Sequence, residues 1–210
     1  MPILSAQDAL ERLREGNRRF VSGTQIRDTN PGHTPPADRE KNQEPFAIIL
    51  GCSDSRVPAE IVFDQGLGDL FVIRVAGNIV APSQVGSVEF ASARFGTRLV
   101  VVLGHSQCGA ITATLEELQQ PTQNQSNNLR SIVDRVRPSV EALLESELKH
   151  DLEALVERAV RANVGVSVDH LRNGSEILKQ LIRDEGLRIV GAEYSLETGE
   201  VDFFDCAQMV

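Results

Sequence analysis

The sequence has few aromatic residues and none of the features that mark secreted or membrane proteins. It contains no tryptophan, one tyrosine and three cysteines among 210 residues. No window approaches the roughly 18 consecutive apolar residues that a membrane helix needs. The N-terminal region carries Glu11, Arg12 and Arg14 where the core of a secretory signal would be apolar. We therefore expect a cytoplasmic protein without a membrane partner.

Basic residues are too few to suggest a nucleic-acid-binding surface. The 21 Lys and Arg residues are outnumbered by 30 Asp and Glu residues, which gives a formal net charge of −9 that repels a phosphate backbone. The hydrophobic fraction of 41% is that of an ordinary globular protein. We expect a single domain over residues 1–210, with an N-terminal helix and extended arm at 1–44 and a core at 45–210.

The hydrophobic pattern predicts an α/β fold. Residues 5–20 have helical spacing, and the Pro- and Gly-containing stretch at 22–44 is expected to run over the surface or across a partner subunit. Short apolar runs that alternate with helical stretches indicate a mostly parallel sheet of four or five strands flanked by helices. The expected strands are 47–50, 70–73, 99–103 and 187–190, with an edge strand at 201–204, and the expected helices are 86–95, 109–119, 128–148, 151–172 and 175–185.

The cysteines point to metal chemistry rather than to disulfides. Their number is odd and their spacing is wide, which does not suit a disulfide framework. Cys52 directly follows one predicted strand, and His105 and Cys108 follow another. The carboxyl ends of parallel strands meet at one edge of a sheet, so these side chains can converge. Two thiolates and one imidazole suit Zn²⁺, and a three-residue ligand set leaves a fourth position for water.

Two residues after Cys52 extend this site. Asp54 could occupy the fourth position on the metal in a closed state, or it could accept a hydrogen bond from the bound water. Arg56 could hold the Asp54 carboxylate in a bidentate pair and so select between these two roles. Cys206 has no metal-ligating motif beside it, and we expect it to be a packed thiol.

Taken together, these motifs resemble the β-class carbonic anhydrases, in particular their plant-like branch. The resemblance implies one Zn²⁺ per subunit, held by Cys52, His105 and Cys108, and a catalytic dyad of Asp54 and Arg56. It also implies a homodimer or homotetramer whose N-terminal helical arm packs on a partner subunit. The motifs are GCSDSRVPAE (51–60), DLFVIRVAGN (69–78), GSVEFA (86–91) and VVLGHSQCGA (101–110).

The same resemblance assigns residues to the substrate. Gln43 lies nine residues before Cys52, where members of the plant-like branch carry a glutamine that hydrogen-bonds substrate. Phe71 and Phe90 match apolar pocket positions, and some pocket residues are expected from a neighbouring subunit. Val57 suits the approach of the apolar CO2 molecule, and the backbone N–H of Gly109 would bind a substrate oxygen.

Two positions bear on regulation. The bicarbonate-regulated bacterial branch carries a tryptophan three residues before the first zinc cysteine, whereas this chain has Ile49 there. We therefore do not expect that form of bicarbonate regulation. Arg74 matches another residue of that regulatory site, but an arginine after a buried strand is more simply explained as one partner of a structural ion pair.

The expected reaction is the reversible hydration of CO2 to bicarbonate and a proton, by attack of zinc-bound hydroxide on CO2. One alternative is a zinc hydrolase acting on a CO2 analogue, CS2 or COS. A second alternative is a non-catalytic zinc protein that senses bicarbonate, with Asp54 as a fourth closed ligand. Arg56 and Gln43 argue against this second alternative, because a purely structural metal site needs neither a dyad partner nor a substrate amide.

Overall fold

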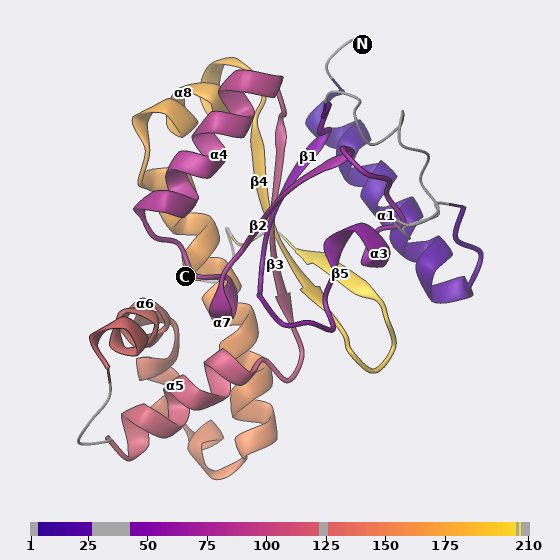
Figure 1. Ribbon diagram of the computed structural model, residues 1–210. Helices are drawn as coiled ribbons and strands as arrows, with labels where there is room; N and C mark the ends of the chain where they lie inside the picture. Colours follow the sequence, from indigo (N-terminus) through magenta and orange to yellow (C-terminus); the bar gives the residue numbers. More distant parts are fainter. Residues whose placement is uncertain (1–3, 27–42, 122–125, 205, 207–210) are drawn as a thin grey trace.

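The computed structural model describes residues 4–26, 43–121, 126–204 and 206 of the chain. Most of the expected connector, including His33, lies outside these residues. Figure 1 shows a central sheet with helices on both of its faces and a group of helices beyond one end. Among the described helices, none is both long and apolar enough to cross a membrane.

The sheet has five strands in the order β2-β1-β3-β4-β5 (Figure 1). Four strands run parallel, and β5 pairs antiparallel with β4 at one edge. The prediction of a mostly parallel sheet with an edge strand at 201–204 is therefore confirmed. The strands are β1 (Ala47–Gly51), β2 (Leu70–Arg74), β3 (Leu99–His105), β4 (Arg188–Tyr194) and β5 (Val201–Phe204).

The two central strands are buried along their whole length, which explains why their sequences are continuous apolar runs. One face of the sheet is covered by α1 (Ala6–Ser22) and α3 (Ala59–Val62). The other face is covered by α4 (Pro82–Phe95), α7 (Leu152–Asn173) and α8 (Glu176–Asp184). Burial on both faces fixes the positions of the loops that leave β1 and β3.

A third apolar cluster lies beyond the carboxyl end of β3. It is formed by α5 (Gly109–Gln119), α6 (Asn127–Leu144) and part of α7, and Figure 1 shows these helices below the sheet. Cys52 and Cys108 belong to this cluster. The two cysteines of the loops after β1 and β3 therefore lie in a largely apolar environment, although neighbouring residues of these loops are exposed.

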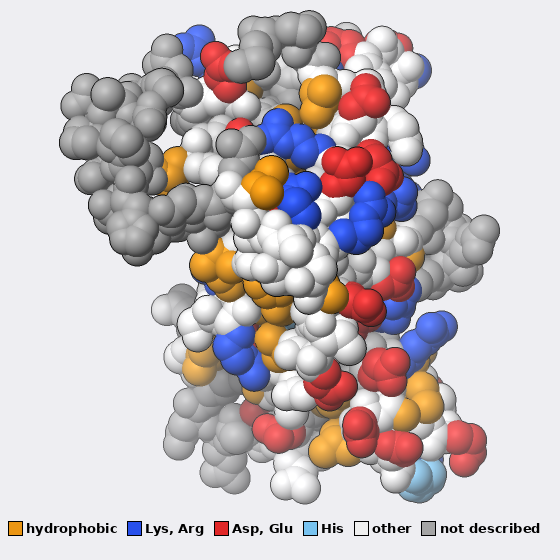
Figure 2. All heavy atoms as spheres, turned by 90° about the vertical axis from the view of Figure 1, so that its right-hand side faces the viewer, with side chains coloured by type: hydrophobic (Ala, Val, Ile, Leu, Met, Phe, Trp, Pro, Cys, Tyr) orange, Lys and Arg blue, Asp and Glu red, His pale blue; other side chains and the backbone are white. Residues whose placement is uncertain are grey.

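Helix α1 packs its apolar side on the chain's own sheet through residues such as Leu10 and Leu13. Its outer side carries ion pairs, of which Arg18–Glu11 is the shorter at 2.8 Å. Figure 2 views this side of the molecule and shows acidic and basic side chains intermixed. The packing of the N-terminal arm on a partner subunit stays a prediction, because the structure describes one chain.

Several local elements differ from the sequence prediction. Helix α4 begins at Pro82 rather than at residue 86, because proline suits the first turn of a helix, where no N–H bond is lost. The helix expected at 128–148 ends at Leu144, and a short 3₁₀ segment, η2 (Glu147–His150), starts with a capping bond from Leu148 N–H to the Ser146 hydroxyl. The short elements α3 and η1 (Ala76–Asn78) were not anticipated, because three or four residues are too few to show a helical period.

Candidate metal centre

Two neighbouring strand ends deliver the three predicted metal ligands to one place. Strand β1 ends one residue before Cys52, and β3, which pairs directly with β1, ends at His105. Cys108 is the residue that precedes helix α5. All three side chains are buried, and their ligand atoms lie within 4.8 Å of one another. The structure thus brings Cys52, His105 and Cys108 together in a group that could hold a metal ion.

A tight turn returns Cys108 towards His105. Gln107 adopts a left-handed conformation with φ of 56°, which reverses the chain within three residues. Ser106 anchors this turn to the end of β4, because its N–H donates to the Tyr194 carbonyl at 2.9 Å and its hydroxyl accepts from Leu196 N–H at 2.9 Å. The conformation of the turn between His105 and Cys108 is therefore held by hydrogen bonds to the end of the neighbouring strand and the residues after it.

The orientation of His105 leaves one ring nitrogen available. Its Nδ1 lies 2.9 Å from the Ser106 carbonyl, so the proton of a neutral ring is held at Nδ1. Nε2 is buried and has no hydrogen-bond partner among the described residues. A buried polar atom without a partner is costly, and a metal ion would satisfy the lone pair on Nε2.

The two cysteines differ in the pKa of their thiols, in opposite directions. The Cys108 thiol donates towards Cys52, and the Gly77 N–H also donates to Cys52 Sγ at 3.4 Å. These bonds hold the pKa of Cys52 well below its ordinary value, while the neighbouring thiolate and burial raise the pKa of Cys108. The site already favours one thiolate, which is the form that binds metal ions.

Asp54 lies beside this group and is paired with Arg56. The Asp54 carboxylate accepts two bonds from the Arg56 guanidinium, at 2.9 Å and 2.8 Å, and one from the Arg56 N–H at 2.9 Å. This bidentate pair holds the pKa of Asp54 well below its usual range. Asp54 Oδ2 lies 3.8 Å from His105 Nε2, but Asp54 is not part of the three-residue group. In the structure the Asp54 carboxylate is therefore paired with Arg56.

Arg74 has a different role from the ion pair expected from the sequence. Its Nε donates to the Cys52 carbonyl at 3.0 Å, and its Nη2 donates to the Asp54 carbonyl at 2.5 Å. No ion pair of Arg74 is found among the described residues. The acceptors that the structure shows for Arg74 are backbone carbonyls, which a sequence pattern does not reveal. Arg74 instead links the end of β2 to the loop that carries Cys52 and Asp54.

The residues predicted to contact substrate fall into two places. Val57 is buried after the Asp54 loop, and Gly109 is exposed at the first position of α5, so both lie in the loops of the metal group. Gln43, Phe71 and Phe90 do not. Gln43 precedes β1 and lies next to Gly68, so the whole strand separates it from Cys52. The chain does not bring Gln43 to its own metal group.

Phe71 and Phe90 form part of an aromatic cluster on the edge strand β2 and helix α4. Their ring centroids lie 6.2 Å apart, and both rings contact Phe95. Phe71 pairs in register with Ile48, four residues before Cys52, which places it about 13 Å from the metal end of the sheet along the strand. The Phe90 side chain is 54% exposed. Phe90 is therefore exposed beside the sheet edge and Phe71 is partly buried against the core, and neither ring belongs to the Cys52 group of the same chain.

The sequence analysis missed residues that support the metal group from behind. The η1 turn after β2 carries Gly77, which bonds Cys52, and Asn163 and Ser167 of α7 bond the carbonyls of this turn. The motif at 69–78 contains Gly77 and Asn78, and a Gly-Asn pair after a strand is a usable turn signal. No sequence signal marks Asn163 or Ser167, because a polar residue in an amphipathic helix ordinarily faces solvent.

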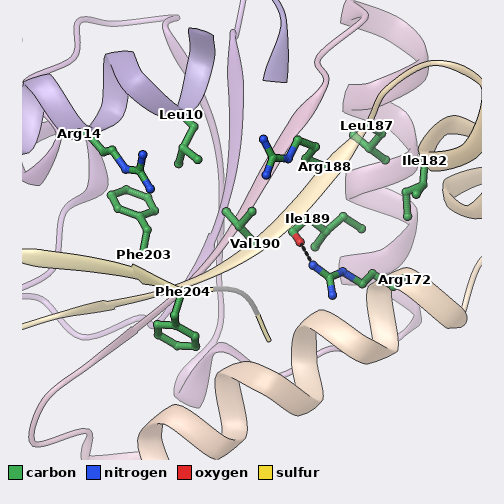
Figure 3. A pocket seen from close by; sticks show the side chains of 10 residues that line it. All are labelled: Leu10, Arg14, Arg172, Ile182, Leu187, Arg188, Ile189, Val190, Phe203 and Phe204. Atoms are coloured by element: carbon green, nitrogen blue, oxygen red, sulfur yellow. Dashed lines mark hydrogen bonds between the residues drawn. The ribbon is translucent and has the colours of Figure 1, made fainter. Parts of the chain in front are cut away.

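A cavity of about 330 Å³ lies elsewhere, at the start of β4 (Figure 3). It is lined by apolar side chains and by Arg14, Arg172 and Arg188. Arg172 and Arg188 bond a carbonyl and a glutamine amide respectively, namely Ile189 O and Gln7 Oε1. Strands β3 and β4 run parallel from Leu99–Arg188 to His105–Tyr194, so this cavity is at the end opposite to the metal group. None of its lining residues belongs to the metal group or to the loops around it.

Cys206, predicted to be a packed thiol, is buried in the core cluster that includes α7 and α8. Its sulfur lies close to Gly191 of β4, where a larger residue would have no room for its Cβ. Cys206 therefore belongs to the packing of the sheet and is separate from the other two cysteines, as the sequence indicated.

Similarity to known proteins covers almost the whole chain. Residues 47–201 match the family model described as carbonic anhydrase. Carbonic anhydrase 2 of Mycobacterium tuberculosis is 39% identical over 201 residues, which cover 95% of this chain and 93% of that protein. The crystal structure of the β-carbonic anhydrase CafA of Aspergillus fumigatus superposes with a TM-score of 0.70 at 26% identity, over 79% of this chain and 78% of that one. A tetrameric β-carbonic anhydrase of Sordaria macrospora has the same fold, with a TM-score of 0.72 at 24% identity, over 90% of this chain and 93% of that one.

Proposed function

Because the chain belongs to the β-class of the carbonic anhydrase family, we propose that it catalyses the reversible hydration of CO2 to bicarbonate and a proton with one bound Zn²⁺. The observation that carries this proposal is the convergence of Cys52, His105 and Cys108, with the Asp54–Arg56 pair beside them.

Zinc fits the donor set of this group. Two sulfur donors and one imidazole nitrogen are the ligands that Zn²⁺ accepts, and three protein ligands leave one position open. The buried Nε2 of His105 lacks any other described partner, and Cys52 is poised as a thiolate. When bound, Zn²⁺ would lower the pKa of a coordinated water to near 7 and so supply a nucleophile at neutral pH.

Asp54 is proposed to act as a hydrogen-bond acceptor next to that open position. Its carboxylate is ionised and oriented by the bidentate pair with Arg56. It would accept a hydrogen from a water molecule at the open position and so fix the direction of the lone pairs on that water oxygen. Arg56 keeps Asp54 in the paired arrangement and away from the metal. The proposed role of Arg74 is to hold the backbone of the same loop through the Cys52 and Asp54 carbonyls.

The substrate is proposed to enter between Val57 and the start of α5. Val57 is apolar and buried, which suits CO2, a molecule without charge. The N–H of Gly109 belongs to the first turn of α5, where backbone N–H groups have no partner within the helix. It would donate to a substrate oxygen as negative charge develops there.

Gln43, Phe71 and Phe90 are proposed to act on the metal group of a neighbouring copy in a homodimer or homotetramer. The support is their position away from the chain's own Cys52: Gln43 precedes β1, Phe71 lies on the edge strand β2, and Phe90 lies on α4 beside Phe71. A two-fold related copy would present the same three residues to this chain. The amide of Gln43 would then donate to a substrate oxygen, and the two rings would exclude water.

Stopped-flow CO2 hydration with a pH indicator tests the proposal, on protein whose zinc content has been measured. We expect fast hydration whose rate rises in proportion to the zinc content of the preparation. Protein stripped with a chelator serves as the matched control and should lose activity until Zn²⁺ is returned. Stoichiometric zinc with hydration no faster than buffer would overturn the proposal. That result would direct attention to CS2 or COS hydrolysis and to a non-catalytic zinc protein.

A further inference from the structure

A second layer of bonds supports the metal group through the η1 turn. The η1 turn connects β2 to α4, and the N–H of its Gly77 donates to Cys52 Sγ at 3.4 Å. A hydrogen bond to a ligating thiolate reduces the electron density that sulfur offers to a metal, and such outer partners orient the ligand. The direction of the Gly77 N–H therefore matters to the proposed metal ligand.

The turn itself cannot fix that direction well. Gly77 has a left-handed backbone with φ of 69°, and a Cβ added there would lie 3.2 Å from the Ala110 side chain. Only glycine suits this position, and glycine has the largest backbone freedom of any residue. A turn built around such a residue needs an external anchor to hold one orientation.

Helix α7 provides the anchor. Asn163 Nδ2 donates to the Gly77 carbonyl at 2.8 Å, and Ser167, one helical turn later, donates to the Asn78 carbonyl at 3.0 Å. The two side chains lie on the same side of the helix because residues four apart are neighbours. Both are buried, so their bonds to the turn are shielded from water.

The helix is also fixed relative to the other metal loop. Val160 and Val164 of α7 lie directly over Gly104, the residue before His105, where a Cβ would meet Val164 at 2.6 Å. Helix α7 thus contacts the strand that carries His105 and bonds the turn that contacts Cys52. A displacement of Asn163 relative to β3 is prevented by this close packing.

Packing alone does not account for an amide at position 163. Neighbouring buried positions of α7, such as Val160, Val164 and Val168, are aliphatic. The Asn163 Oδ1 atom is buried and has no hydrogen-bond partner among the described residues. An unpaired buried amide oxygen costs stability, and an aliphatic residue would avoid that cost. Among the described residues, the side-chain hydrogen bond found for Asn163 is the one to the Gly77 carbonyl.

We propose that Asn163 is a positioning residue for the metal centre: by holding the Gly77 carbonyl it fixes the turn so that the Gly77 N–H points at Cys52 Sγ. This inference rests on the proposed function, since it assumes that Cys52 ligates a metal. It assigns a task to a helix whose sequence carries no motif for metal binding. Asn163 acts through Gly77 and touches neither substrate nor metal.

The test replaces the amide by a group of similar size that cannot donate. Asn163→Leu removes the bond to the Gly77 carbonyl, and Ser167→Ala is the matched control, because Ser167 has the same burial and helix but bonds the next carbonyl. Zinc affinity is measured by competition with a chromophoric chelator. We expect about a tenfold loss of affinity in Asn163→Leu, the lower end of the range for outer-sphere partners of metal ligands. We expect a smaller loss in Ser167→Ala, because this substitution releases the Asn78 carbonyl and leaves the bond to the Gly77 carbonyl in place.

Cobalt substitution gives a readout that a loss of stability alone would not move. We expect the sulfur-to-cobalt charge-transfer band of Asn163→Leu to shift relative to the unaltered protein, because Cys52 loses a bond that withdraws electron density. In the metal-free protein, the Gly77 amide resonance should also move. Equal affinity, an unshifted band and an unchanged amide resonance in folded Asn163→Leu would overturn the proposal, as would equal effects of both substitutions.

A second variant tests the proposal even if Asn163→Leu does not fold. Asn163→Ser is smaller and keeps a donor, and we expect it to lie between Asn163→Leu and the unaltered protein in the band position. If Asn163→Ser instead behaved like Asn163→Leu in every measurement, the hydrogen-bond donor at position 163 would have no role, and the proposal would be contradicted. Failure of the proposed function is distinguishable, because it would appear as normal zinc binding without CO2 hydration in the unaltered protein.

Discussion

The residues that we assign to the metal and those that we assign to substrate are held in different ways. Cys52, His105 and Cys108 are buried at the ends of two paired strands and converge within 4.8 Å. Gln43 and Phe90 are exposed and lie near the opposite end of the sheet from Cys52. The difference teaches that one chain brings its candidate metal ligands together by itself. The substrate contacts that we propose for Gln43 and Phe90 would need a second chain.

This division follows from the topology of the sheet. Parallel strands place all their carboxyl ends at one edge, so residues after β1 and β3 meet without any long-range adjustment. Gln43 comes before β1, and Phe71 stands near the start of β2, so the same topology carries them to the other edge. Edge strand β2 has only one neighbour in the described sheet, which leaves its side of the molecule open to a partner.

The largest effect is expected from removing a sulfur ligand. Cys108→Ala should leave two of three donors in the group, and we expect zinc content and CO2 hydration to fall together to near background. Metal analysis of the purified protein is the measurement. Cys206→Ala removes a buried thiol that is outside the group and should keep its zinc. Full zinc content in Cys108→Ala would remove this residue from the ligand set.

Asp54→Asn should separate metal binding from turnover. Asparagine has the same shape but no charge, so it cannot form the ion pair with Arg56, and its NH2 group cannot act as an acceptor. We expect full zinc content and a loss of about 10² to 10⁴ in kcat, the range for a positioned acid–base group. Steady-state kinetics on zinc-quantified protein provide the check. Unchanged kcat would show that Asp54 is not needed beside the metal.

Arg74→Lys should have a smaller effect on the same region. One ammonium cannot reproduce the two directed bonds that the guanidinium donates to the Cys52 and Asp54 carbonyls. We expect about a tenfold loss of kcat/KM with zinc retained, in line with other outer partners of a metal site. Arg183→Lys, at an exposed ion pair with Asp184, is the control and should behave as the unaltered protein. Equal kinetics in Arg74→Lys would limit Arg74 to packing.

The sheet and the metal group could be predicted from sequence because their signals are local. Fully buried strands read as apolar runs, and Cys52, His105 and Cys108 follow such runs directly. The order of these pieces along the chain, with the general rule for parallel sheets, was enough to expect them together. Strand β5 could be predicted as an edge strand, because its sequence is a short, mostly apolar run, and the structure leaves its residues partly or fully exposed.

The supporting contacts could not be predicted, because they join residues through backbone atoms. Arg74 bonds two carbonyls, and Asn163 bonds the carbonyl of Gly77, 86 positions away. A sequence does not indicate which carbonyl faces which side chain. The distance between Gln43 and Cys52 could not be predicted either. Nine residues can span a short or a long distance, and the distance is long here because the five residues of β1 between them are extended.

A partial recovery of activity in mixed dimers would test most directly whether Gln43 and the metal group that it serves belong to different chains. Mixing Asp54→Asn chains with Gln43→Ala chains under conditions that exchange subunits creates mixed dimers. If Gln43 serves the partner's metal group, each mixed dimer has one site with both substitutions and one with neither. Random exchange should then restore about a quarter of the unaltered activity, since half of the dimers are mixed and half of their sites are intact.

If Gln43 instead served its own chain, every site in a mixed dimer would carry one substitution, and activity would stay at the average of the two parents. Exchange of Asp54→Asn with Arg56→Ala chains is the control, because both residues belong to one metal group and no intact site can form.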